Sequence, residues 1–418
     1  MLQVIMVSSD SHAGFSTKKW LAVVGIGEDG LSGLGETACR LIAEADVVFG
    51  GHRHLHHAAS TITGRAVPWP SPFDTAMKAV LAERGLKVCV LASGDPFHFG
   101  VGTTLARHVD PSEMIVLPAP STFSLAAARL GWALNEVETI SLHGQPIERI
   151  RPLLHPGRRI IALTSDGSSP ASIARLLVAD GFANSHINVL ESLGGGNEQV
   201  VACAASELAS QRFGELNVVT VDVRVAPDAR ILPLGFGLDD ALFLHDGQIT
   251  KREIRAVTLS ALAPRRGELL WDIGAGSGSI AIEWMLSHPS MRAIAIERNA
   301  ARIARIRENA ARFGIPSLRI VEGAAPGACE GLQMPDAIFI GGGGSRDGIV
   351  DFALEALRPG GRLVANAVTL EMEAMLLGLH GRLGGRLTRI SIASAEPVGT
   401  MSGWRPAMPV TQWAWVKP

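Results

Sequence analysis

Short apolar runs alternate with stretches of helical spacing along most of the chain. The runs at 20–24, 46–49, 87–92 and 114–117 predict buried strands, and glycine or proline residues follow each of them closely. Between the first two runs, LGETACRLIAEA places apolar residues at intervals of three and four, which is typical of an amphipathic helix. The alternation predicts an α/β fold with helices packed on mainly parallel strands.

The same alternation continues to the end of the chain, with one interruption. Further strands are expected at 159–163, 187–190, 217–222, 268–272, 292–297, 318–321, 336–340 and 362–365, and helices at 170–180, 299–313 and near 348–357. The run APDARILPLGFGLDD mixes proline, glycine and aspartate and indicates a domain boundary. We therefore expect a loose N-terminal tail at 1–19 and two different α/β domains, at 20–228 and 229–418.

Composition narrows the classes of protein to consider. The 418 residues carry 38 Lys+Arg against 40 Asp+Glu, a net charge of −2, so a basic surface for nucleic acid is not expected. The four cysteines lie far apart and fit a reducing compartment. The N-terminal MLQVIMV lacks the basic flank of a signal peptide, and no apolar run reaches about 18 residues. We expect a cytoplasmic protein that does not enter membranes.

The sharpest chemical signal is a glycine-rich turn between a predicted strand and a predicted helix at 268–286. The turn reads Gly274-Ala275-Gly276-Ser277-Gly278. Glycines let the backbone approach a ligand closely, and the following helix start offers unpaired N–H groups. Two cofactors use such a turn, a dinucleotide or S-adenosylmethionine, and a turn without any ligand is the third interpretation.

Two details of this turn favour the methyl donor. The third glycine of a dinucleotide site would fall at Ser279. Asp272 lies two residues before Gly274, where a dinucleotide strand is usually apolar, and its charge can attract the cationic end of the donor. Glu297, at the end of the next strand, can accept the ribose hydroxyls of either cofactor, so it does not discriminate between them.

The second domain resembles the class I methyltransferases. Residues 336–342 resemble that family's fourth strand and 358–364 the entry to its fifth. Related cobalamin-pathway enzymes have an acid where this chain has Ala324, so backbone near Ala325 is expected to contact the adenine. The resemblance implies a donor site at Thr250, Asp272, Gly274, Ala275, Gly276, Ser277, Gly278, Glu297 and Ala325.

The first domain resembles the tetrapyrrole methylases, or class III methyltransferases. The resemblance rests on the glycine loop at 25–30, the S-G-D-P turn at 93–96 and the segment at 118–127, although Glu28 replaces that family's usual proline. It implies a two-lobed domain and a donor site at Ser93, Gly94, Asp95, His98, Ser121, Thr122 and Ser165. Taken alone, S-G-D-P is also an ordinary turn sequence.

The histidine-rich segment at 51–57 invites a metal hypothesis. Metal ligands normally converge from several elements, and no partner cluster is evident in the sequence, so we expect a solvated loop and no metal. The segment also resembles a stretch of the tetrapyrrole methylases, which implies that Arg53 and His54 face substrate carboxylates.

Together the two domains resemble the fused, decarboxylating precorrin C5,15-methyltransferases of cobalamin biosynthesis. The tail at 403–413 is similar to the C-terminal end of those enzymes, and it also fits a Trp-rich final pair of strands. The resemblance implies one S-adenosylmethionine site per domain, methylation of a precorrin at C5 by the first domain and at C15 by the second, loss of the ring-C acetate carboxyl to give precorrin-8, and a homo-oligomer.

Substrate contacts and catalytic groups are less defined by the sequence. Asn366 and Arg405 are expected near the substrate, and no general acid or base can be named. The arginines of 299–313 spread around that helix and fit a solvated face. An NAD-linked oxidoreductase and a non-catalytic tetrapyrrole- or nucleotide-binding protein are the alternative functions.

Overall fold

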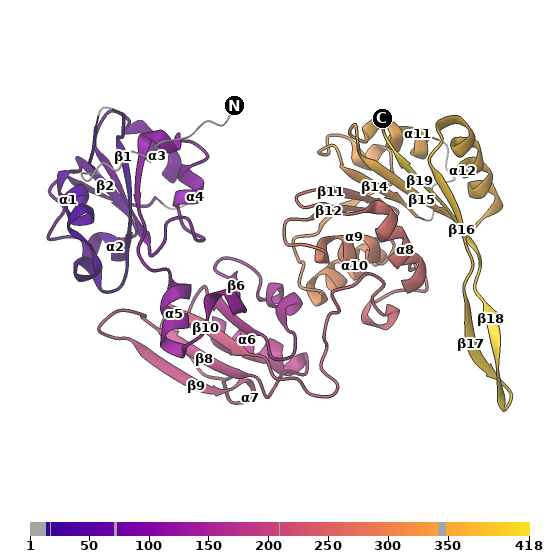
Figure 1. Ribbon diagram of the computed structural model, residues 1–418, viewed down its shortest axis with the longest axis horizontal. Coiled ribbons are helices and arrows are strands. Elements are labelled where there is room, and N and C mark those ends of the chain that lie inside the picture. Colours follow the sequence, from indigo (N-terminus) through magenta and orange to yellow (C-terminus); the bar gives the residue numbers. More distant parts are fainter. Residues whose placement is uncertain (1–13, 17, 71–72, 209, 342–347) are drawn as a thin grey trace. The chain divides into compact units, whose positions relative to one another are not determined.

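The structure is a computed structural model and describes residues 14–16, 18–70, 73–208, 210–341 and 348–418 (Figure 1). Most of the tail expected at 1–19, and Gly342 of the predicted fourth-strand motif, lie outside these residues. The chain forms two compact units. The first contains Met1–Gln145 and Pro156–Ala229, and the second contains Pro146–His155 and Arg230–Pro418.

The first lobe of the first unit is a parallel five-stranded sheet. Its order is β3-β2-β4-β1-β5, and its strands are β1 (Leu21–Ile26), β2 (Val47–Gly50), β3 (Arg65–Pro68), β4 (Val88–Ser93) and β5 (Met114–Leu117). The helices are α1 (Glu36–Glu44), α2 (His52–His57), α3 (Ala76–Ala82) and α4 (Gly102–Leu105). All six residues of β1 are buried because apolar clusters cover both faces of the sheet.

The second lobe is a mixed five-stranded sheet. Its order is β6-β7-β10-β8-β9, and only β6 and β7 pair in parallel. The strands are β6 (Val137–Ser141), β7 (Arg159–Leu163), β8 (His186–Glu191), β9 (Gln199–Ala204) and β10 (Asn217–Asp222). The helices are α5 (Thr122–Leu130), α6 (Ser169–Ala179) and α7 (Ala205–Leu208). Phe123 of α5 packs in a core with residues of β7, β8 and β10.

The second unit is built on a seven-stranded sheet with the order β13-β12-β11-β14-β15-β19-β16. The strands are β11 (Leu269–Ile273), β12 (Arg292–Glu297), β13 (Arg319–Glu322), β14 (Ala337–Ile340), β15 (Arg362–Ala367), β16 (Arg386–Ile390) and β19 (Val410–Val416). The helices are α8 (Arg252–Leu262), α9 (Ser279–Leu286), α10 (Ala300–Arg312), α11 (Ile349–Ala356) and α12 (Leu370–Leu383). The strand order reverses between β11 and β14, the place where doubly wound sheets bind ligands.

A two-stranded hairpin, β17 (Ala393–Val398) and β18 (Met401–Pro406), extends from the seven-stranded sheet of the second unit (Figure 1). Residues 403–413 lie in two strands, β18 and β19 (Val410–Val416), but these two strands do not pair with each other as a final strand pair would. β18 pairs with β17, whereas β19 inserts between β15 and β16. The sequence could not show this because the partners are distant along the chain.

The α/β fold class is confirmed, and the predicted strands fall within about two residues of the observed ones. The strands β3, β6, β9, β16 and β17 were missed because most of their residues are exposed or half-buried. The expected solvated loop at 51–57 was also wrong, since its residues form α2. Among the described residues, no helix is both long enough and apolar enough to cross a membrane.

Candidate functional site

The glycine turn joins β11 to α9 at the switch point of the seven-stranded sheet. Gly274, Gly276 and Gly278 all have positive φ, at 74°, 60° and 78°. A Cβ on Gly278 would lie 2.9 Å from Cγ2 of Ile306, so the turn passes directly against α10. The turn therefore requires glycine both for its backbone conformation and for this close approach.

Glu297, at the end of β12, holds the glycine turn in place. Its Oε2 accepts a hydrogen bond from the Gly276 N–H at 2.9 Å, and its Oε1 accepts from the N–H groups of Arg298 and Asn299, both at 3.0 Å. The side chain is buried. A carboxylate oxygen can accept two hydrogen bonds, so Oε2 keeps the capacity for a ligand hydroxyl.

Asp272 lies beneath the turn and is only 1% exposed. Its Oδ2 accepts from the Ala281 N–H at 3.1 Å, whereas its Oδ1 is buried and has no partner among the described residues. Burial, with a smaller contribution from the nearby Glu297 charge, raises the pKa of Asp272 to about 7 against the opposing Ala281 hydrogen bond. The Ser277 hydroxyl is likewise buried without a partner. Two unsatisfied polar atoms at one turn fit a polar, cationic ligand.

Residues 237–250, here called the strap, border this turn. The Gln248 carbonyl oxygen lies 3.2 Å from where a Cβ on Gly276 would stand. The Thr250 carbonyl accepts a hydrogen bond from Arg255. On the other side of the turn, the Gly323 N–H donates to the Glu297 carbonyl at 2.9 Å and starts the loop that contains the buried Ala325. The glycine turn, Asp272 and Glu297 are thus brought together, with the segments of Thr250 and Ala325 at their border.

The two residues expected near the substrate in this unit have other partners. The Asn366 amide donates to Thr258 Oγ1 at 2.9 Å and accepts from Gln412 at 3.0 Å, which ties β15 to α8 and β19. Arg405 lies on β18, is mostly exposed and pairs with Glu396 at 3.1 Å. Within the described residues, these hydrogen bonds and this ion pair join both side chains to elements other than the glycine turn.

In the first unit, the turn after β4 meets two other segments at very short range. A Cβ on Gly25 would overlap the carbonyl oxygen of Gly94 and lie 2.6 Å from the Ala119 N. Gly94 has a φ of 55°, which favours glycine. Asp95 Oδ1 accepts from the Phe97 N–H at 2.8 Å and shapes the turn itself. The three segments on which the resemblance to the tetrapyrrole methylases rests, at 25–30, 93–96 and 118–127, therefore meet in the structure.

A cavity of about 250 Å³ opens beside this junction. It is lined by the predicted Ser93, His98, Ser121 and Thr122, and by His54 from α2. Sequence reasoning missed its aromatic lining, which comes from Trp69, Phe73, Phe99 and Phe123. These residues occur at no regular spacing, and only the tertiary fold collects them. Ser165 lies elsewhere, where its hydroxyl accepts from the Gly144 N–H at 2.9 Å.

The histidine-rich helix α2 carries a charged cluster next to the cavity. Glu28, the residue that departs from the family's proline, pairs with Arg53 at 3.0 Å and with His57 at 3.6 Å. His54 Nε2 lies 2.9 Å from the Ser93 hydroxyl. Burial first, and then the charges of Arg53 and His57, lower the pKa of His54 to about 4. His54 is therefore neutral at physiological pH, and Glu28 supplies the counter-charge for Arg53.

The folds of the two units are those of two different kinds of methyltransferase domain. Residues 21–209 match the family model of tetrapyrrole (corrin/porphyrin) methylases, and residues 241–417 match that of the precorrin methyltransferase domain. Both resemblances noted in the sequence are confirmed.

Whole-length relatives identify the family. The chain is 61% identical over 398 residues, 95% of its length and 96% of the relative's, to a precorrin-6Y C(5,15)-methyltransferase (decarboxylating) of Sinorhizobium sp. It belongs to the precorrin-6Y C(5,15)-methyltransferase (decarboxylating) family, whose members are methyltransferases that depend on S-adenosylmethionine. The oxidoreductase and non-catalytic alternatives find no support.

Two relatives from Salmonella typhimurium each match part of the chain. A cobalt-precorrin-6B C(15)-methyltransferase (decarboxylating) is 36% identical over 41% of this chain and 92% of its own. A cobalt-precorrin-7 C(5)-methyltransferase is 29% identical over 43% of this chain and 88% of its own. In these relatives, the two activities named together in the whole-length family reside in separate proteins.

Proposed function

We propose that this chain methylates a precorrin at C5 and C15 and removes the carboxyl of the ring-C acetate, giving precorrin-8 in cobalamin biosynthesis. The family to which the chain belongs supports this activity. The observation that carries it furthest is the glycine turn with the buried, unpartnered Oδ1 of Asp272 below it, which fits a cationic donor.

We assign C5 methylation to the first unit and C15 methylation with decarboxylation to the second, each with its own donor site. The existence of single-activity relatives that match less than half of the chain supports two independent sites. Residues 241–417 match a precorrin methyltransferase domain, and the single-activity C(15)-methyltransferase relative is named as decarboxylating, which supports placing both steps in the second unit.

S-adenosylmethionine supplies an electrophilic methyl group on a sulfonium sulfur. In the second unit, Asp272 would face the cationic end of the donor, the glycine turn would receive its carboxylate and Glu297 its ribose hydroxyls. In the first unit, Ser93, Ser121 and Thr122 offer hydroxyls around an aromatic cavity. The role of these residues is to place the methyl group in line with the substrate carbon and to exclude water.

The substrate provides the reacting electrons in each step. A meso carbon of the macrocycle forms the new C–C bond as the S–CH₃ bond breaks, and the carbon then loses its proton. In the decarboxylation, the electrons of the breaking C–C bond enter the conjugated macrocycle, and a proton replaces carbon dioxide. This chemistry requires positioning more than a covalent intermediate, which fits sites built from hydroxyl, backbone and carboxylate groups.

The two-site proposal is tested by titrating the intact chain with S-adenosylhomocysteine. We expect two moles bound per chain, and one mole for Gly276→Val, whose side chain would enter the space beside the Gln248 carbonyl. With a reduced precorrin, that variant should add no methyl at C15 and release no carbon dioxide. Intact-chain variants are preferable to a cut near residue 228, because Pro146–His155 belongs to the second compact unit. A wild-type chain that binds one mole or none refutes the two-site assignment.

We also propose a homo-oligomer that covers the β17–β18 hairpin. Two-stranded hairpins are marginally stable alone, and this one exposes Val398, Met401 (76%) and Trp404 (77%). Sedimentation of the wild-type chain should show a species larger than 44.1 kDa that Trp404→Ser weakens. A monomeric wild-type chain contradicts this. A cytoplasmic location and the absence of nucleic-acid binding remain predictions from cysteine usage and charge.

A further inference from the structure

The strap at 237–250 is anchored at both ends by a buried ion pair. Arg255 of α8 pairs with Glu283 of α9, and both side chains are almost fully buried. The Glu283 carboxylate accepts from the N–H groups of Gly237 and Leu238, at 2.7 and 3.0 Å. Arg255 donates to the carbonyls of Leu238 and Thr250. These anchors hold the strap onto the domain independently of its middle part.

The middle of the strap is held by the buried ring of Phe243, whose centroid lies 4.4 Å from that of Phe313, and by the buried amide of Asn309 on α10. Its Oδ1 accepts from the Leu244 N–H at 2.8 Å, and its Nδ2 donates to the Leu244 carbonyl at 2.9 Å. The same Nδ2 donates to the Ser277 carbonyl at 3.0 Å. Asn309 is fully buried, so one side chain joins the strap directly to the glycine turn.

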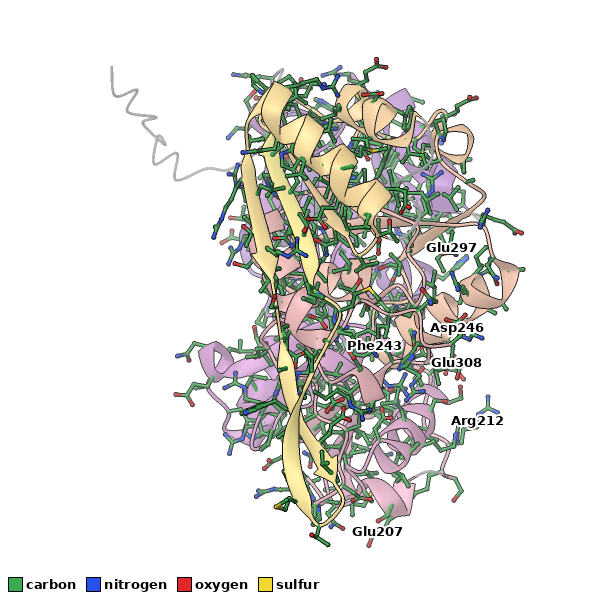
Figure 2. The ribbon with its side chains drawn as sticks, turned by 90° about the vertical axis from the view of Figure 1, so that its right-hand side faces the viewer. Glu207, Arg212, Phe243, Asp246, Glu297 and Glu308 are labelled. Carbon is green, nitrogen blue, oxygen red and sulfur yellow. The ribbon has the colours of Figure 1, made fainter. Side chains whose placement is uncertain are left out.

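A further polar contact to the middle of the strap is a partly exposed ion-pair cluster. Arg302 and Arg305 pair with Asp246 at 3.0 and 2.8 Å (Figure 2, Asp246 labelled). Each of these side chains is about one third exposed, so solvent screens the pairs and their contribution to strap position is small. Asn309 differs from these contacts because it bonds both the strap, at Leu244, and the glycine turn, at Ser277.

An amide at this buried position requires an explanation beyond packing. The interior of α10 packs through apolar residues such as Ile303, Ile306 and Ala310, and a buried polar side chain costs free energy unless it is fully hydrogen-bonded. Asn309 makes three hydrogen bonds that no apolar residue could make. They fix the Ser277 backbone, and with it the buried Ser277 hydroxyl, relative to the Gln248 carbonyl beside Gly276.

We propose that Asn309 is a positioning residue of the donor site in the second unit, where its amide holds the strap in register over the glycine turn and thereby sets donor affinity. The inference rests on the proposed function, since it presumes a donor at this turn. Because Glu283 and Arg255 hold the strap ends and Phe243 is buried in the core, loss of Asn309 changes the position of residues 244–248 without releasing the strap.

The test is a titration of the intact chain with S-adenosylhomocysteine, using Gly276→Val to identify which of the two sites belongs to the second unit. Asn309→Ala should bind about tenfold more weakly at that site and normally at the other, which serves as an internal control. Asn309→Asp keeps the acceptor for the Leu244 N–H but loses both donated bonds, and it should weaken the same site at least as much.

Arg362→Leu is the matched control for general destabilisation. Arg362 is also buried, donates to the Leu262 carbonyl at 2.9 Å and pairs with Glu268, but it lies at the start of β15, at the opposite end of the sheet from the turn. This variant should lower the unfolding temperature and leave donor affinity unchanged.

Hydrogen exchange on the wild-type chain keeps the test decisive if the Asn309 variants do not fold. Donor analogue should slow exchange of the amides at 244–250. Wild-type affinity in both Asn309 variants, or unchanged exchange of the strap amides on binding, overturns the positioning role while leaving the two-site assignment intact. A wild-type chain that binds no analogue overturns both proposals.

Discussion

Replacing Asp272 with asparagine should separate the stability of the second unit from its donor affinity. The folded-state pKa of Asp272 is about 7, against an ordinary value of 3.8, and its first cause is burial. As pH rises from about 4, the unfolded chain loses this proton before the folded chain does. Stability contributed by the protonated form is therefore lost between pH 4 and 7, which amounts to roughly 4 kcal/mol for this group.

Asp272→Asn carries no charge, so this pH-dependent loss should disappear. The asparagine oxygen can still accept from the Ala281 N–H, but its amide nitrogen takes the place of the unpartnered Oδ1 and costs roughly 1–3 kcal/mol. The ligand-free second unit should therefore be about 1–3 kcal/mol more stable than wild type at pH 8 and no more stable at pH 4. Calorimetry of the intact chain at the two pH values measures this difference.

Asp272→Asn, which should stabilise the ligand-free second unit at pH 8, should at the same pH weaken its affinity for the donor. With a pKa of about 7, the Asp272 carboxyl is about one tenth ionised at pH 6 and about nine tenths at pH 8. If the ionised form binds the cationic donor, affinity for S-adenosylmethionine at this site should rise about tenfold between those pH values, and Asp272→Asn should bind weakly at both. A variant that is less stable than wild type at pH 8, or that keeps the wild-type pH profile, refutes this reasoning.

Three further perturbations test other parts of the chain. Gly25→Ala should destabilise the first unit by roughly 1–3 kcal/mol and abolish C5 methylation but not C15 methylation, because its Cβ would overlap the Gly94 carbonyl; product masses decide this. The pKa of His54 is about 4 in the folded chain, so the unfolded chain takes up a proton first as the pH falls, and the first unit should lose stability between pH 6.5 and 4. This loss should be smaller in His54→Gln. A variant whose thermal melts show the same acid sensitivity as wild type would contradict the burial argument. Arg255→Leu should lower the free energy of unfolding in urea by roughly 3–5 kcal/mol, because Glu283 stays buried without its ion-pair partner. Arg255→Lys should recover only part of this loss, because lysine cannot reach all the groups to which Arg255 donates. Wild-type stability in the lysine variant would contradict this role of the guanidinium group.

Much of the fold and of the candidate donor site in the second unit could be predicted from local sequence. Apolar runs such as β11 are buried on both faces and are bounded by glycine, so their positions can be recognised without knowing their neighbours. The turn at 274–278 combines strand, glycines and helix in one short segment, and Glu297 ends the next strand in the same sheet. Sequence motifs describe such features because the interacting residues are close along the chain or lie on adjacent strands.

Other features depend on contacts between residues that are far apart in sequence. In the sequence, Asn309 is one polar residue among others in a predicted helix. Only the packing of the folded chain places it against Leu244 and Ser277. The aromatic lining of the first cavity comes from several elements with no common spacing. The high pKa of Asp272 is a consequence of its burial, which no local pattern reports. The sequence by itself determined most of the buried strands and the position of the glycine turn. The tertiary structure decided which buried polar groups are paired, because pairing and desolvation depend on distances that only the folded chain defines.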